Sequence, residues 1–379
     1  MQDSSYSLED FESLMLQAEA EEFSYQRVLL HEEALGVARS LGDEDAVAYS
    51  MAQLCLAYAY SGMLYRLPEL FDETLAFIEG HLHLESRPMV IEILGCCFKF
   101  VLLAETDHPA TPVSALVARL EQLREFMVEQ DGCMQEYYLR SFYAYRDFGD
   151  FQLAADAFAA WQVEPKEGRF SECPSCLPIH EIRELSYQGR FAEAAELGEQ
   201  VLARPEEFCQ SQPLNLHMSL LQAWVHLGEI SLAKKRHRVL LLSALIDPLG
   251  GEFLPDHYRF FADFADAKQD RGLRLGRAFF ASNIKHWAQV ETPRILMETA
   301  ACAARMLYRV GSSGRRMRKV RFEGDCLPWG SMPDLMEPTV REAAQWCEEL
   351  ALQLAQRFDA RPGLVQPHTV ADIQALIRS

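Results

Sequence analysis

The sequence predicts an all-α chain of helical pairs that recur about every 40 residues. Apolar and aromatic residues recur at steps of three and four, which is the spacing of one face of a helix. Turn residues recur at a near-constant distance along the chain, which indicates a repeat architecture. No run of β-branched residues alternates with polar ones, so the sequence does not predict β-strands. A repeat array can exceed the size of an ordinary domain, so one array can account for most of the 379 residues.

The clearest repeat is Gln135–Trp161. Its first helix is expected to carry Phe142 and Tyr145 on one apolar face. Gly149 ends that helix, because glycine readily adopts the left-handed conformation found after helix C-termini. A second apolar run follows, in which the small Ala154 lets the two helices approach closely. The segment therefore predicts a helix–turn–helix hairpin.

The same layout returns elsewhere in the chain. It is clear in His180–Leu202 and Leu214–Leu240 and weaker in Ala46–Ile78. One register places the turns of the hairpins near Phe23, Gly62, Thr106, Gly149, Gly189, Gly228, Asp270 and Gly311. Successive turns are about 40 residues apart. The sequence thus predicts about eight helical hairpins over residues 1–310.

The carboxyl-terminal part is expected to differ from the array. Residues 311–338 are rich in glycine and proline and predict an irregular segment. Thr339 and Glu342 form a capping box that indicates the start of a helix. That helix and a shorter one, Val370–Ile377, make residues 339–379 a cap over the apolar face of the last repeat.

Three cysteines form a candidate metal site. Cys173 and Cys176 have the Cys-x-x-Cys spacing that can place two thiolates on one zinc ion. Cys209 lies 36 residues after Cys173, in the loop that enters the next repeat, and stacked repeats would bring these loops together. His217 is the preferred fourth ligand and His180 its rival. A single structural zinc ion, unpaired thiols and a redox pair all remain open, although no thioredoxin-like context surrounds the motif.

The charge and the cysteines bear on partners and location. Residues 1–150 carry 27 acidic and 9 basic side chains, whereas residues 151–379 carry 29 and 27. An acidic amino-terminal half argues against a general nucleic-acid binder, because phosphates would be repelled. Scattered cysteines, a polar start and no apolar run long enough for a bilayer lead us to expect a cytoplasmic protein without a membrane segment.

Residues 315–321 form one dense basic segment in this acidic protein. Its charged residues are Arg315, Arg316, Arg318, Lys319 and Arg321. The segment can be a solvated loop, or it can bind an acidic protein, phosphate or nucleic acid, or the acidic surface of its own chain. The sequence leaves these readings open.

The repeats resemble the tetratricopeptide consensus. The resemblance rests on an aromatic residue four positions before the turn glycine, an aromatic or apolar residue two after it and alanine five after it. It implies a right-handed superhelical solenoid whose first helices line a concave groove. By this resemblance, the groove would present Gln53, Tyr60, Tyr143, Arg146, Arg183, Tyr187, Gln222 and His226.

The function implied is the binding of a protein or peptide in that groove. Tyrosine and arginine are frequent interface anchors, because each combines a large contact area with a polar group. The alternative is a peptide-sensing regulator that controls a second protein through a change in superhelix pitch. An enzyme is not expected, because no catalytic constellation is visible in the sequence.

Overall fold

The structure is a computed structural model that describes residues 6–209, 212–244, 253–268, 270–284, 287, 292–311 and 338–379. Helices account for 79% of these residues, and no strand is present among them. The prediction of an all-α chain is confirmed for this part of the chain. The basic segment falls outside the described residues.

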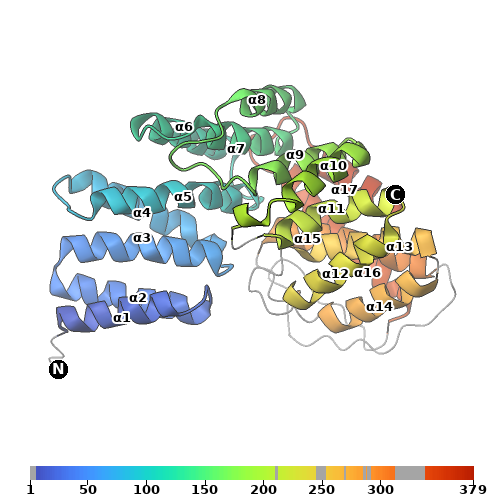
Figure 1. The fold of residues 1–379 in the computed structure, drawn as a ribbon, viewed down its shortest axis with the longest axis horizontal. Helices are drawn as coiled ribbons and strands as arrows, with labels where there is room; N and C mark the ends of the chain where they lie inside the picture. Colours follow the sequence, from blue (N-terminus) through green and yellow to red (C-terminus); the bar gives the residue numbers. More distant parts are fainter. Residues whose placement is uncertain are drawn as a thin grey trace. The chain divides into compact units, whose positions relative to one another are not determined.

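The chain divides into two compact units, Met1–Ser171 and Glu172–Ser379. The described part of the first unit holds eight α-helices and one 3-10 helix. They are α1 Leu8–Ala20, α2 Tyr25–Leu41, α3 Glu44–Tyr60, η1 Leu64–Arg66, α4 Leu67–Gly80, α5 Arg87–Thr106, α6 Val113–Glu129, α7 Met134–Asp147 and α8 Phe151–Val163. The α-helices are labelled α1 to α8 in Figure 1.

The second unit is helical throughout its described part. Its helices are α9 Leu177–Tyr187, α10 Phe191–Leu202, η2 Pro205–Glu207, α11 Leu214–His226, α12 Ile230–Ala244, α13 Leu254–Lys268, α14 Asp270–Asn283, α15 Pro293–Gly311, α16 Val340–Asp359 and α17 Thr369–Arg378. The array predicted over residues 1–310 includes residues of both units, and its bounds stay a prediction.

Seven of the eight expected turns fall where one helix ends and the next follows, including the three that carry no glycine. The eighth, Gly311, is the last residue of α15, and the residues after it lie outside the described part of the chain. The four clearest glycines, Gly62, Gly149, Gly189 and Gly228, have φ between 73° and 81°, as a left-handed helix terminus requires. The residue after each of them donates a backbone hydrogen bond to the carbonyl five positions earlier, at distances of 2.8 to 3.2 Å. These four turns therefore share the same backbone hydrogen bond.

The hairpins pack as the repeat predicts within each unit. In every hairpin the two helices contact each other, and the small residues Ala154, Ala194 and Ala233 are buried. First helices also pack on the next first helix, α3 on α5 and α5 on α7 in one unit, and α9 on α11, α11 on α13 and α13 on α15 in the other. From α3 onward, each first helix thus packs against its own second helix and against a neighbouring first helix of its unit, whereas α1 packs on α2 and α2 packs on α3.

The carboxyl-terminal helices close the second unit. The predicted capping box is present, because Thr339 accepts a hydrogen bond from the Glu342 amide and Glu342 accepts one from the Thr339 amide. Helix α16 packs on α15, and α17 packs on both. The apolar face of α15 is therefore covered.

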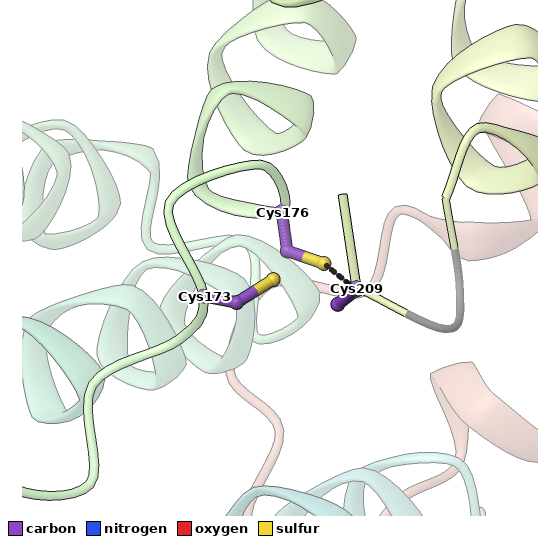
Figure 2. Close-up of side chains that lie close together, drawn as sticks. All are labelled: Cys173, Cys176 and Cys209. Carbon is purple, nitrogen blue, oxygen red and sulfur yellow. Dashed lines mark hydrogen bonds between the residues drawn. The ribbon is translucent and has the colours of Figure 1, made fainter. Parts of the chain in front are cut away.

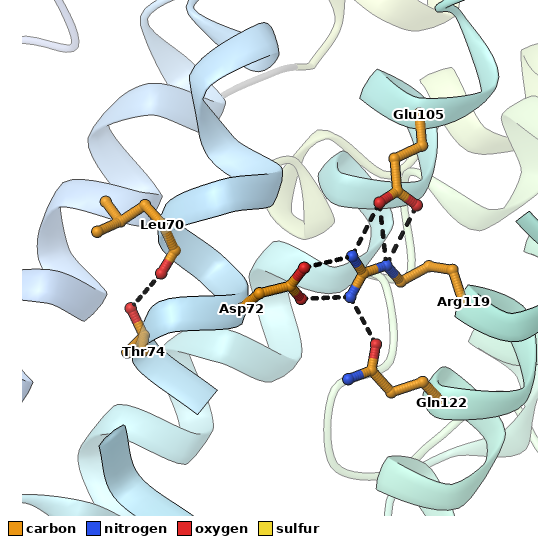
Figure 3. Close-up of polar contacts among 6 residues, drawn as sticks. All are labelled: Leu70, Asp72, Thr74, Glu105, Arg119 and Gln122. Carbon is orange, nitrogen blue, oxygen red and sulfur yellow. Dashed lines mark hydrogen bonds and ion pairs between the residues drawn. The ribbon is translucent and has the colours of Figure 1, made fainter. Parts of the chain in front are cut away.

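A largely buried arginine links three helices of the first unit (Figure 3). Arg119 of α6 binds Asp72 of α4 through both terminal nitrogens, at 2.6 and 2.9 Å, and Glu105 of α5 at 2.8 to 3.2 Å. Gln122 accepts a further bond from Arg119 at 2.5 Å. The Arg119 side chain is only 10% exposed, while Asp72 is 51% exposed. Burial raises the pKa of Glu105, and the hydrogen bonds from Arg119 oppose that rise.

Candidate metal centre

The sulfur atoms of Cys173, Cys176 and Cys209 meet in the second unit. All three lie within 4.8 Å of one another, and the Sγ atoms of Cys176 and Cys209 are 3.5 Å apart (Figure 2). Cys173 and Cys176 lie just before α9, and Cys209 follows η2 in the connection from α10 to α11. The prediction that these two loops bring the cysteines together is confirmed, and the cluster could hold a metal ion.

A tight turn positions the first two cysteines. The amides of Cys176 and Leu177 both donate to the carbonyl of Cys173, at 2.9 and 3.2 Å. The Ser175 hydroxyl is buried inside this turn, 3.5 Å from the Cys173 sulfur. The two thiols are therefore aimed to the same side of the turn by its backbone.

Gln212 supports the cluster and was missed in the sequence. Its side-chain nitrogen donates to the Cys176 sulfur at 3.5 Å, and its side-chain oxygen accepts from the Leu216 amide at 3.2 Å. The side chain is buried and links the cluster to the first turn of α11. Glutamine at this spacing from a cysteine has no recognisable pattern, so only the fold reveals its role.

The thiols influence one another's ionisation. A hydrogen bond from Cys176 holds the pKa of Cys173 well below its ordinary value. The same interaction, together with burial, raises the pKa of Cys176. The pair therefore loses a first proton readily and a second with difficulty, because two thiolates at this distance repel each other. A bound cation would offset that repulsion.

The two candidate histidines differ in their surroundings. The cluster of described ligand atoms within 4.8 Å contains neither His217 nor His180. His180 has its Nε2 2.8 Å from a carboxylate oxygen of Glu172. His217 lies on α11, is buried, and has no hydrogen-bond partner on either ring nitrogen. Burial lowers the pKa of His217 to about 4, so its ring is neutral near pH 7. Its role as the fourth ligand stays a prediction.

The predicted groove residues of the first unit lie on two first helices. Gln53 and Tyr60 are on α3, and Tyr143 and Arg146 are on α7. The Tyr60 ring contacts two further aromatic rings, and the Arg146 guanidinium lies 5.4 Å from the centre of the Tyr143 ring. The structure thus brings Tyr143 and Arg146 together as neighbours on one face.

The remaining groove residues belong to the second unit. Arg183 and Tyr187 are exposed on α9, and Gln222 and His226 are on α11. Arg183 donates to the Ser219 hydroxyl of α11 at 3.2 Å, one helical turn before Gln222. Arg183 and Gln222 therefore share a surface. The convergence of residues from both units on one ligand stays a prediction.

The basic residues Arg315, Arg316, Arg318, Lys319 and Arg321 lie outside the described part of the chain. Among the helices described, none is both long and apolar enough to cross a membrane. No protein-family model matches the chain, and no curated protein matches it in sequence.

Proposed function

We propose that the chain is a cytoplasmic binding protein built as a tetratricopeptide-like solenoid of right-handed twist. The observation that carries the proposal is the regular hairpin, whose turn recurs at seven of the expected positions in the described part of the chain. The stacking of successive first helices in each unit supports it, because that stacking lines one wall with side chains from consecutive repeats. Such a wall suits an extended peptide or a partner helix.

The recognition surface proposed is the set of tyrosines and arginines on these first helices. Arg146 and Arg183 would bind acidic side chains or the carboxylate end of a peptide. Tyr143 and Tyr187 would supply apolar contact, and Tyr187 is 72% exposed. Large exposed aromatic side chains next to arginines are typical of interface anchors.

Site-specific cross-linking tests this surface. We expect a photoreactive phenylalanine in place of Tyr143 or Tyr187 to cross-link a protein of the native host. Matched probes at Tyr25 and Val128, exposed positions on the second helices α2 and α6, should not do so. Equal cross-linking from both sets, or none from the first helices, would contradict the proposed surface.

We also propose that one zinc ion binds Cys173, Cys176 and Cys209, with His217 as fourth ligand. Three thiolate ligands and one imidazole make a closed tetrahedral site of the structural kind. What favours His217 over His180 is that both of its buried ring nitrogens lack a partner, whereas His180 is engaged with Glu172. A zinc ion bound there would link the hairpin α9–α10 to helix α11.

A further inference from the structure

The loop after α8 folds back onto earlier helices of the same unit. Residues 165–171, the return strap, pass the connection between α6 and α7 and reach α5. The Cys133 amide donates to the Arg169 carbonyl at 2.8 Å, and the Cys133 thiol donates to the Pro165 carbonyl at 3.2 Å. Gly132 and Arg169 form an isolated parallel bridge. The strap therefore pairs with the backbone of the first unit as an added peptide segment would.

The ring of Phe170 fills a notch that is lined by two glycines, Gly95 and Gly132. A Cβ added to Gly95, in the middle of α5, would overlap this ring, and a Cβ on Gly132 would lie 2.9 Å from it. Phe126 of α6 borders the notch, with its ring centre 5.5 Å from that of Phe170. A helix interior normally disfavours glycine, so Gly95 is explained by the space that it leaves for an aromatic side chain.

Arg169 holds the strap beside the notch. Its side chain donates to Glu92 of α5 at 2.6 Å and to the Gln130 carbonyl at 2.9 Å. Its guanidinium also lies 4.6 Å from the centre of the Phe170 ring. Arg169 and Glu92 are 32% and 53% exposed, so water can compete for this ion pair. The notch thus binds an arginine followed by an aromatic residue. The ion pair of the arginine is partly exposed, so it can break and form again.

The backbone of Phe170 has a conformation that its own side chain disfavours. Its φ is 65°, a left-handed conformation that a bulky side chain rarely adopts. Local preference therefore opposes the bound form of the strap, and the ring and the ion pair maintain it. A strap that binds in a disfavoured backbone conformation is easier for another peptide to replace.

We propose that the notch formed by Gly95, Phe126 and Gly132 with Glu92 is a peptide-binding site for an Arg–aromatic motif, and that the return strap occupies it as an internal competitor. The proposal rests on the proposed function and names a ligand class for it. The notch is built by α5, a first helix, together with Phe126 of the second helix α6 and Gly132 of the connection that follows it. A partner that carries the motif displaces the strap.

The test uses the full-length chain and a fluorescent peptide with the sequence of residues 164–172, EPKEGRFSE. Wild-type protein should bind this peptide weakly, because the strap fills the notch. Phe170→Ala empties the notch and should bind it at least about tenfold more tightly, since the internal competitor is removed. A peptide with alanine in place of phenylalanine should bind neither protein.

A filled notch provides the matched control. Gly95→Ala suits a helix better than glycine does, so it should not weaken α5 itself. Added to Phe170→Ala, it should abolish peptide binding, and alone it should speed tryptic cleavage after Arg169 by expelling the strap. If Phe170→Ala does not fold, Arg169→Ala retains the ring and should give an intermediate gain in peptide affinity.

Two results would overturn the inference. One is equal peptide affinity of wild type and a folded Phe170→Ala or Arg169→Ala protein. The other is undiminished binding after Gly95→Ala in the opened protein. Neither result depends on Tyr143 or Tyr187, so failure of the notch and failure of the cross-linking prediction can be told apart.

Discussion

Cys209→Ser is expected to lower the affinity of the protein for zinc by at least about 100-fold. Loss of a residue that only supports a ligand typically costs 10 to 100-fold, and loss of a ligand should cost more. Cys209 is the thiol contributed by the connection before α11, so its removal would leave the Cys-x-x-Cys pair and His217, one ligand short of a closed tetrahedral site. Metal analysis and competition with a chromophoric chelator would measure the loss.

The exposed Cys96 supplies the control for this experiment. Cys96→Ser should retain zinc at the wild-type stoichiometry, close to one ion per chain. Gln212→Ala should weaken zinc binding by roughly 10-fold or more, because the hydrogen bond to the Cys176 sulfur is lost. His217→Gln should weaken it more than His180→Gln does. A wild-type protein that contains no zinc, with all three thiols freely alkylated while folded, would contradict the metal proposal.

Arg119→Ala is expected to destabilise the first unit by about 3–5 kcal/mol. Removing one partner of a buried ion pair leaves the other charge without compensation. Glu105 is the affected partner, because its side chain is 16% exposed, whereas Asp72 can turn to water. Native-state hydrogen exchange of peptides from α4 to α6 should show the corresponding loss of protection.

Arg124→Ala is the matched control on the same helix. Arg124 pairs with Glu121 of its own helix, and both side chains are exposed, so its loss should leave the exchange of α4 to α6 close to that of the wild type. Glu105→Gln added to Arg119→Ala should recover part of the stability, since the uncompensated charge is removed. Similar exchange in the Arg119 and Arg124 variants would show that the network does not stabilise the unit.

The hairpins were predictable because they depend on local chemistry. A glycine that ends a helix, an aromatic residue four before it and an alanine five after it are all readable within ten residues of one turn. Ala154 and Gly149 illustrate this, since burial and positive φ appear where the pattern placed them. The capping box at Thr339 was equally local.

The long-range contacts were not predictable, because they depend on residues that are far apart in the sequence. Arg119 binds residues 47 and 14 positions earlier, and nothing in its own neighbourhood marks it as buried. Phe170 adopts a positive φ without being glycine, so the strap has no sequence signature. At the metal centre, the cysteines carried a recognisable spacing and Gln212 did not.

The binding claim is tested most directly by capture from a lysate of the native host. Full-length protein would be immobilised, and retained proteins would be quantified for wild type, for Arg146→Ala with Arg183→Ala, and for Arg124→Ala with Arg190→Ala. Both double variants remove two positive charges, but Arg124 and Arg190 are exposed arginines paired with nearby glutamates outside the proposed surface.

Each truncated anchor typically costs 2 kcal/mol or more, roughly thirtyfold in affinity, so the Arg146 and Arg183 variant should lose the partner that the control retains. Helicity should be unchanged in both. If that variant retains the partner at the wild-type level while alanine at Arg315, Arg316 and Arg318 removes it, the first helices are not the binding surface.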